Sequence, residues 1–210
     1  MKRYAVKKTD QPTESRKRQE LPLSVCFVRH AQATEDTRDL SRMEDPPLTA
    51  LGRRQATRLA RRLQTERFSH AYASVMRRCT ETAHAILKFH RHTPYAETRD
   101  LMEVGRDHFI HVPKACHPSC PAMLEQEKDA MNRFANRLRH EHRPGQKILV
   151  VAHGNLIRSL MPMLGGKDAR ESILIEIENA SVTMLDVWSN GAAILKLANC
   201  VRHLLPGEVT

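Results

Sequence analysis

Two histidines and two arginines of this chain stand directly after short apolar segments. Arg29 and His30 end one such segment, His153 ends another, and Arg78 follows a third. A guanidinium group stays charged and binds phosphate oxygens in pairs. A neutral imidazole can attack phosphorus, and nearby cations stabilise the charge that spreads over the phosphoryl oxygens. If these four side chains meet, they form a site for a phosphoryl group.

The predicted secondary structure brings these residues to one edge of a sheet. Short apolar segments alternate with amphipathic ones, which is typical of an α/β three-layer sandwich with a mostly parallel central sheet and helices on both faces. Ligands bind at the carboxyl ends of the strands in such sheets. Thr49 is expected to cap the first helix, and Asn190-Gly191 to turn a hairpin. The predicted strands lie at about 23–29, 70–73, 147–152, 173–177, 182–188 and 192–197, and the predicted helices begin near residues 50, 74, 122 and 156.

The length and composition fit a single globular domain, which we place at residues 21–210 of the 210-residue chain. Residues 1–20 carry seven Lys/Arg and three acidic residues but few apolar ones, so we expect a disordered basic leader. A solvated tail is favoured for it over a nucleic-acid arm or a targeting segment. No apolar run approaches the roughly 20 residues of a membrane span.

The net charge of +10 predicts attraction to anions. Only 4% of the residues are aromatic, however, and nucleic-acid surfaces use aromatic rings to stack on bases. We therefore expect no nucleic-acid partner. The sequence gives no indication of an oligomeric state.

The five cysteines indicate a reducing compartment. Their number is odd and their spacing does not repeat, and the chain has no signal-peptide pattern, so we expect a cytoplasmic protein. Cys116 and Cys120, with His111 and His117 nearby, could hold zinc. The prolines of this segment favour an ordinary loop instead, and we expect neither a metal nor a cofactor.

Four motifs occur in an order that is similar to one known family. The set resembles the histidine phosphatase superfamily, also called the phosphoglycerate-mutase-like family, over roughly residues 23–204. A single Arg-His dipeptide would carry little weight, whereas an ordered set of four is specific. The motifs are VRHA at 28–31, LTALGRRQA at 48–56, SVMRRCTETA at 74–83 and VVAHGNLIR at 150–158.

The resemblance implies a role for each residue of the predicted site. His30 would be the nucleophile that becomes phosphohistidine. Arg29, Arg78 and His153 would hold the phosphoryl oxygens, and Gly154 would donate its backbone N–H to the phosphate. Because the arginines and the histidine supply the charge, this chemistry needs no metal.

A carboxylic acid must protonate the leaving oxygen and later activate water. Glu103 lies in a segment that matches the acid-bearing loop of the family, and it is the predicted proton donor. Glu81 is helical and close to the arginines, so it is predicted to form a salt bridge. Arg78 is preferred to Arg77 because the motif places its arginine four residues after Ser74.

The chain departs from the family directly after the nucleophile, at residues 31–36. An acid at Asp36 would repel an anionic substrate if it pointed inward, so the contribution of this loop to phosphate binding stays open. Gln32 and Asp36 are expected to shape the pocket.

The residues favour a phosphatase that hydrolyses phosphomonoesters. Phosphoglycerate-mutase-type transfer is the alternative within the family, but mutases carry a longer cap over the site than the segment at 105–121. A non-catalytic phosphate-binding regulatory module is the other alternative, and the complete set of site residues speaks against it. Substrates are expected to be phosphorylated small molecules or phosphopeptides. The segment after His153 and the C-terminal hairpin resemble the protein-phosphatase branch, and the entrance is expected to be basic, with Arg106, His108, His111 and Lys114.

Overall fold

A computed structural model describes residues 21–33, 45–105, 121–168 and 175–210. Several predictions fall outside these ranges. They concern the basic leader, the Cys116 and Cys120 zinc alternative, the basic entrance and Asp36. Among the described residues, no helix combines the length and the apolar character that crossing a membrane requires.

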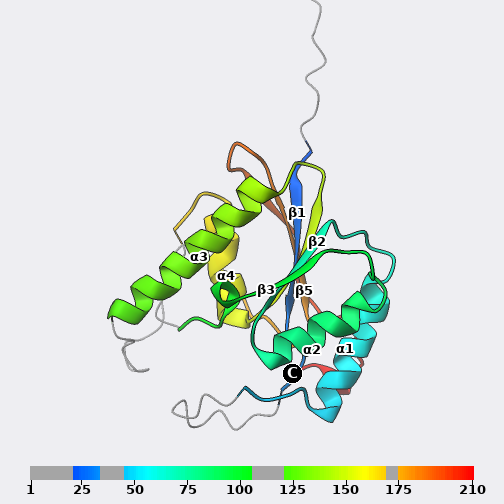
Figure 1. The fold of residues 1–210 in the computed structure, drawn as a ribbon. Coiled ribbons are helices and arrows are strands. Elements are labelled where there is room, and N and C mark those ends of the chain that lie inside the picture. Colours follow the sequence, from blue (N-terminus) through cyan, green and yellow to red (C-terminus); the bar gives the residue numbers. More distant parts are fainter. Residues whose placement is uncertain (1–20, 34–44, 106–120, 169–174) are drawn as a thin grey trace, which may run out of the picture.

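The described part of the chain forms one mixed sheet whose first four strands in spatial order are parallel (Figure 1). The order is β3-β2-β4-β1-β5-β6, and β5 runs antiparallel to both of its neighbours. The carboxyl ends of β1, β2 and β4 therefore lie at the same edge. The strands are β1 (Leu23–Arg29), β2 (His70–Ser74), β3 (Tyr95–Thr98), β4 (Lys147–Ala152), β5 (Val182–Val187) and β6 (Ala193–Cys200).

Helices cover both faces of the sheet, so the predicted three-layer α/β sandwich is confirmed. Figure 1 shows α1 and α2 on one side and α3 and α4 on the other. The apolar residues of α3 that the sequence placed on one face, Met131, Phe134 and Leu138, are fully buried. The helices are α1 (Ala50–Leu63), α2 (Arg77–Leu87), α3 (Pro121–Glu141) and α4 (Gly154–Leu164), with short 3-10 turns η1 (Arg99–Leu101) and η4 (Pro206–Glu208).

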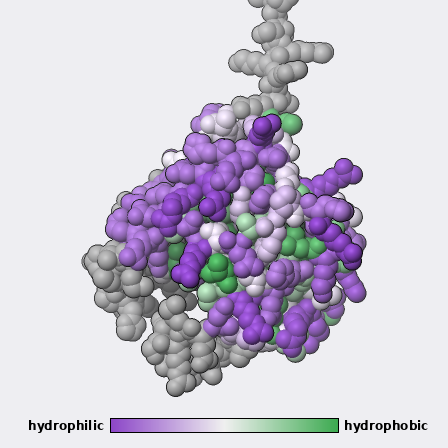
Figure 2. All heavy atoms as spheres, viewed as in Figure 1, coloured by the Kyte–Doolittle hydropathy of each residue, from purple (hydrophilic) through white to green (hydrophobic). Residues whose placement is uncertain are grey.

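The strands serve both layers of the core because their side chains alternate between the faces. Val25 and Phe27 pack in the cluster with α3 and α4, whereas Cys26 and Val28 pack in the cluster with α1 and α2. All four residues are fully buried. The outer faces of the helices are hydrophilic (Figure 2), as the arginines of α1 predict.

Two local predictions are confirmed at the ends of elements. The Oγ1 atom of Thr49 accepts a hydrogen bond of 2.9 Å from the Gly52 N–H and so caps α1. Gly191, with a φ of 84°, turns the hairpin between β5 and β6. Only glycine fits at position 52, because a Cβ there would lie 1.9 Å from the carbonyl oxygen of Gln32. This close approach packs the start of α1 against the segment that follows β1.

Two local predictions are wrong, and one strand was missed. The second helix begins at Arg77 and not at Ser74, because Ser74 belongs to β2 and Met76 has extended backbone angles. The strand β3 was not predicted, since it is short, lies at the sheet edge and buries none of its four residues. Residues 175–177 of the strand predicted at 173–177 form no strand, and the remainder lies outside the described residues. The Ile177 carbonyl oxygen accepts from Arg29 instead of from a neighbouring strand.

Candidate functional site

His30 stands at the carboxyl end of β1, and the backbone of the next residue fixes its ring. Its N–H donates to the Ala152 carbonyl oxygen at 2.9 Å, which extends the contact between β1 and β4 by one residue. The side-chain Nδ1 atom lies 2.9 Å from the Ala31 carbonyl oxygen. A carbonyl oxygen only accepts hydrogen bonds, so Nδ1 carries the ring proton. The Nε2 atom therefore holds the lone pair of the ring.

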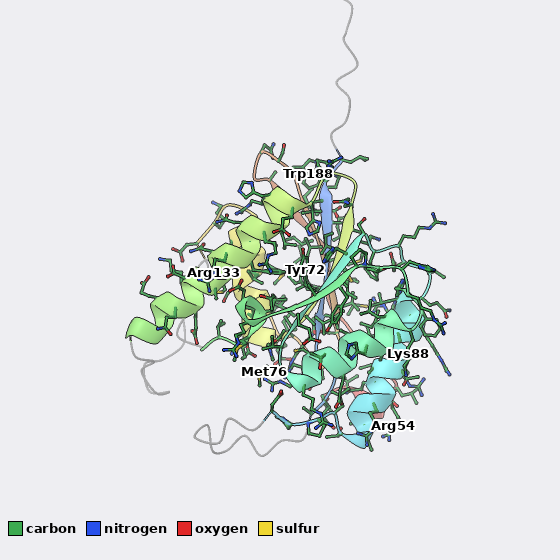
Figure 3. The ribbon with its side chains drawn as sticks, in the orientation of Figure 1. Arg54, Tyr72, Met76, Lys88, Arg133 and Trp188 are labelled. Carbon is green, nitrogen blue, oxygen red and sulfur yellow. The ribbon has the colours of Figure 1, made fainter. Side chains whose placement is uncertain are left out.

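Arg78 bridges this ring and that of His153. Its Nε atom donates to Nε2 of His30 at 3.3 Å, and its Nη2 atom lies 3.2 Å from Nδ1 of His153. A guanidinium group only donates, so both ring nitrogens must be acceptors. The two rings meet edge to face, with their centroids 5.1 Å apart. Met76, labelled in Figure 3, marks the entry to α2 at the same edge of the sheet.

Two buried side chains hold the far side of the His153 ring. Its Nε2 atom lies 3.1 Å from the Ser74 hydroxyl and 3.5 Å from the Cys79 thiol. Because Nδ1 accepts from Arg78, the ring proton is on Nε2 and is donated to the Ser74 oxygen. His153 is thus the opposite tautomer of His30.

Both imidazoles are neutral at physiological pH. Burial, together with the charges of Arg78 and Arg29, lowers the pKa of His30 to about 3 against the opposing effect of the Ala31 carbonyl. Burial is also the main reason why the pKa of His153 lies well below its ordinary value, with His30, Arg78 and Arg29 acting in the same direction. A neutral ring has a lone pair available for attack, whereas an imidazolium ion does not.

Arg29 lies against the start of α4. Its Nη1 atom donates to the Ile177 carbonyl oxygen at 2.6 Å, and a Cβ on Gly154 would lie 3.7 Å from its Cδ and Nε atoms. As the first residue of α4, Gly154 has no acceptor for its N–H within the helix. The positive end of a helix dipole and a guanidinium group both favour an anion at this point.

Glu103 also reaches the first turn of α4. Its Oε1 atom accepts from the N–H groups of Val104 and Leu156, each at 3.1 Å. The residue as a whole is exposed at the surface, while burial of its carboxyl group raises the pKa above the ordinary value. The two hydrogen bonds and the charge of Arg29 oppose this rise. The protonated form of the Glu103 carboxyl group is therefore favoured more in the protein than in water.

The structure places Arg78 against both histidines, whereas Arg29 and Glu103 both lie at the start of α4. The neighbouring arginine, Arg77, has another partner. Arg77 pairs with Glu81 at 2.7 Å, which confirms the salt bridge predicted for Glu81. The side chain of Gln32 accepts from Thr49 at 2.6 Å and so supports α1. Among the described residues, no group of three or more His, Cys, Asp or Glu is arranged to hold a metal ion.

Sequence reasoning missed the residues that support the site. Ser74 and Cys79 contact His153, and Thr82 accepts from the Ala31 N–H at 3.0 Å. Asn179 donates to the His30 carbonyl oxygen at 3.0 Å. The first three lie inside the motif at 74–83, so the motif marked their positions. Their roles depend on contacts between segments that are far apart in the sequence.

Comparison with known proteins decides the family. The model of the histidine phosphatase superfamily (branch 1) matches residues 25–115 and 106–200. The chain belongs to the histidine phosphatase superfamily. The predicted family is confirmed, and the motifs at 28–31, 74–83 and 150–158 supply the two histidines and Arg78 that contact one another.

Both phosphatases and mutases occur among the relatives of this superfamily member. It is 28% identical over 195 residues to the mitochondrial serine/threonine-protein phosphatase Pgam5 of Caenorhabditis briggsae, over 89% of this chain and 66% of that protein. It is 26% identical over 179 residues to the 2,3-bisphosphoglycerate-dependent phosphoglycerate mutase of Bartonella bacilliformis, over 73% of this chain and 87% of that protein. The chain thus spans about two thirds of the length of the Pgam5 relative.

The fold of this superfamily member matches solved structures. Phosphoglycerate mutase from Bacillus anthracis superposes with a TM-score of 0.67 at 22% identity, over 88% of this chain and 96% of that one. The predicted phosphoglycerate-mutase-like architecture is therefore confirmed.

The protonation states at the site predict what a nuclear magnetic resonance (NMR) titration will show. At pH 7 both rings should be neutral, with the proton of His30 on Nδ1 and that of His153 on Nε2. Imidazole ¹⁵N chemical shifts distinguish the two tautomers and the cation. His30 should take up a second proton only near pH 3, because burial and two arginines disfavour its cation. A cationic His30 ring at pH 5, a cationic His153 ring at pH 7, or the same tautomer on both residues would contradict this assignment.

The same shifts make stability depend on pH. Both folded-state pKa values lie below the unfolded value of about 6.5, so the unfolded chain binds more protons below that pH. Stability from the neutral rings is fully present above pH 6.5 and is lost as the pH falls below it. Each ring contributes up to about 1.4 kcal/mol per pH unit. Urea unfolding of the His153→Asn variant should therefore show a shallower pH dependence than the wild type.

Proposed function

We propose that this chain hydrolyses phosphomonoesters through a phosphohistidine formed on His30. The observation that carries the proposal is the neutral His30 ring, whose Nδ1 proton is bound by the Ala31 carbonyl and whose Nε2 lone pair faces Arg78. The guanidinium group can bind the phosphoryl oxygens of an anionic substrate. It thereby holds the phosphorus atom close to the lone pair that attacks it. Superfamily membership and a protein-phosphatase relative support the same chemistry.

In the first half of the reaction, Nε2 of His30 forms a bond to phosphorus as the bond to the leaving oxygen breaks. Positive charge develops on the ring, and the Ala31 carbonyl stabilises it through Nδ1. The leaving oxygen takes its proton from the Glu103 carboxyl group. In the second half, the Glu103 carboxylate accepts a proton from water, whose oxygen attacks phosphorus. The bond from phosphorus to nitrogen breaks, inorganic phosphate leaves, and both residues return to their starting states.

Four groups would hold the transferred phosphoryl oxygens: Arg29, Arg78, His153 and the N–H of Gly154. In the free site, Arg78 donates hydrogen bonds to the two histidines. A bound phosphate competes for these donors, and its charge raises the pKa of His153 relative to the free site. His153 can then carry a proton on Nδ1 and donate it to a phosphoryl oxygen.

The substrate class follows from the relatives and from the phosphate clamp, the four groups that would hold the phosphoryl oxygens. The clamp recognises a phosphate group and makes no demand on the rest of the molecule, so phosphorylated small molecules and phosphopeptides both qualify. The similarity to a serine/threonine-protein phosphatase supports phosphopeptides. These assignments require no metal, since two guanidinium groups and a helix start supply the positive charge.

Phosphoglycerate-mutase-type transfer is the second candidate, because a phosphoglycerate mutase is among the relatives. The two activities give different products. Incubation with 3-phosphoglycerate and 2,3-bisphosphoglycerate yields 2-phosphoglycerate if the chain is a mutase, and inorganic phosphate if it is a phosphatase. Phosphate release without isomerisation supports hydrolysis, and isomerisation that outpaces phosphate release overturns it.

The His30→Ala variant should lose at least about a thousandfold of the wild-type turnover of p-nitrophenyl phosphate between pH 5 and 8, because it lacks the nucleophile. Circular dichroism establishes that the variant is folded. The Arg77→Gln variant is the control, since Arg77 pairs with Glu81 away from the histidines, and it should stay within about twofold of the wild type. An inactive wild type, or an active His30→Ala variant, would exclude the proposed nucleophile.

The Glu103→Gln variant should slow the hydrolysis of alkyl phosphates by roughly a hundredfold, because their poor leaving groups need an acid. The loss with p-nitrophenyl phosphate should be much smaller, since nitrophenolate departs without a proton. Glu97→Gln, which alters an exposed carboxylate on β3, is the matched control. Equal losses with both substrates would move the acid role to another group.

A further inference from the structure

Two buried amide side chains connect the last residues of the chain to the nucleophile. Gln55, fully buried in α1, donates through Nε2 to the Glu208 carbonyl oxygen at 2.6 Å and to the Thr210 hydroxyl at 3.0 Å. Asn179 is 5% exposed. Its backbone N–H donates to the Thr210 carbonyl oxygen at 2.8 Å, and its Oδ1 atom accepts from the Thr210 hydroxyl at 3.3 Å. The hydroxyl of one exposed residue thus joins two buried amides.

The opposite ends of these two amides hold the segment that carries the nucleophile. Gln55 accepts through Oε1 from the Gln32 N–H at 2.7 Å, and Asn179 donates through Nδ2 to the His30 carbonyl oxygen at 3.0 Å. Each amide has both ends engaged, so its rotation is fixed by the pair of contacts. The Thr210 hydroxyl is a partner of both.

All six backbone polar groups of residues 30–32 have partners, and these amides supply a partner to two of them. The partners are Ala152 O and Asn179 Nδ2 for His30, Thr82 Oγ1 and His30 Nδ1 for Ala31, and Gln55 Oε1 and Thr49 N for Gln32. The His30 carbonyl oxygen also accepts from the Ala180 N–H at 3.2 Å. The Ala31 carbonyl fixes the His30 ring, so its position determines where Nε2 points. A change at either amide therefore reaches the reacting atom through one peptide unit.

A charged contact fastens the other side of the 208–210 segment to α1. The Glu208 carboxylate is 3.7 Å from Nε of Arg54 and 2.7 Å from Nε of Arg58, and its side chain is only 9% exposed. Arg54 lies on α1 (Figure 3), and the C-terminus lies at the same edge of the sheet as the end of β1 (Figure 1). The 208–210 segment is thus held both by α1 and by the loop before β5.

We infer that Thr210 is a positioning residue for the nucleophile: its hydroxyl holds Gln55 and Asn179, and through them the backbone of residues 30–32 that aims Nε2 of His30. The kinetic consequence rests on the proposed phosphatase reaction. Misaiming the nucleophile slows attack, whereas Arg78, His153 and Gly154 are held by other segments and keep their affinity for phosphate. The effect therefore falls on kcat and leaves KM unchanged.

The test compares three variants with p-nitrophenyl phosphate as substrate. Thr210→Val removes the hydroxyl at constant shape and should lower kcat about tenfold, since small errors of alignment are costly, with KM within about twofold. Thr210→Ser restores the hydroxyl and should recover kcat to within about twofold. Thr57→Val makes the same change on the exposed face of α1, where the hydroxyl donates to the Arg53 carbonyl of the same helix, and should have no effect.

A second readout does not require activity. The Nδ1 proton of His30 reports its hydrogen bond to the Ala31 carbonyl, and its NMR signal should shift or broaden in Thr210→Val and return to its wild-type position in Thr210→Ser. Thr210 is exposed, so these variants keep the core intact, and thermal melting verifies this.

An inactive wild type would defeat the proposed function while leaving the NMR comparison in force. Two results would overturn the positioning role. One is a Thr210→Val variant whose kcat and Nδ1 signal both match the wild type. The other is an equal loss of kcat in the valine and serine variants.

Discussion

The site depends on one guanidinium group placed between two neutral imidazoles. Arg78 donates to Nε2 of His30 and to Nδ1 of His153, and it can do so only if neither nitrogen carries a proton. This requirement fixes the tautomer of both rings and sends their protons outward, to the Ala31 carbonyl and the Ser74 hydroxyl. Burial acts in the same direction, because it disfavours a second positive charge beside the arginine. The interaction leaves a lone pair on Nε2 of His30 at physiological pH.

The sheet supplies this geometry through the order of its strands. Because β1 and β4 are parallel neighbours in register, the residues that follow Arg29 and Ala152 stand side by side, and these are His30 and His153. β2 lies on the other side of β4, so α2 starts beside the same edge and carries Arg78 across to both rings. Three segments that are far apart in the sequence thereby supply the three members of one hydrogen-bonded set.

Much of this arrangement was predictable from the sequence, because it is encoded in short patterns. Apolar segments that end in histidine gave the strands and their polar ends, and the motif spacing distinguished Arg78 from Arg77. The strand β3 has no such pattern, since its residues are only partly buried. The supporting contacts were also out of reach: Asn179, Gln55 and Thr210 become neighbours of the nucleophile only through the fold. A buried amide and a surface amide look alike in a sequence.

The bond between His30 and phosphorus is the central claim, and trapping it is the most direct test. The wild-type chain, mixed with a ³²P-labelled phosphomonoester and quenched in alkali, should carry label that is stable to base and labile to acid. Peptide mapping should place the label on His30, and NMR should place the phosphoryl group on Nε2, since Nδ1 is occupied by its hydrogen bond to the Ala31 carbonyl. Label on another residue, or turnover of substrate without any labelled enzyme under rapid quenching, would contradict it.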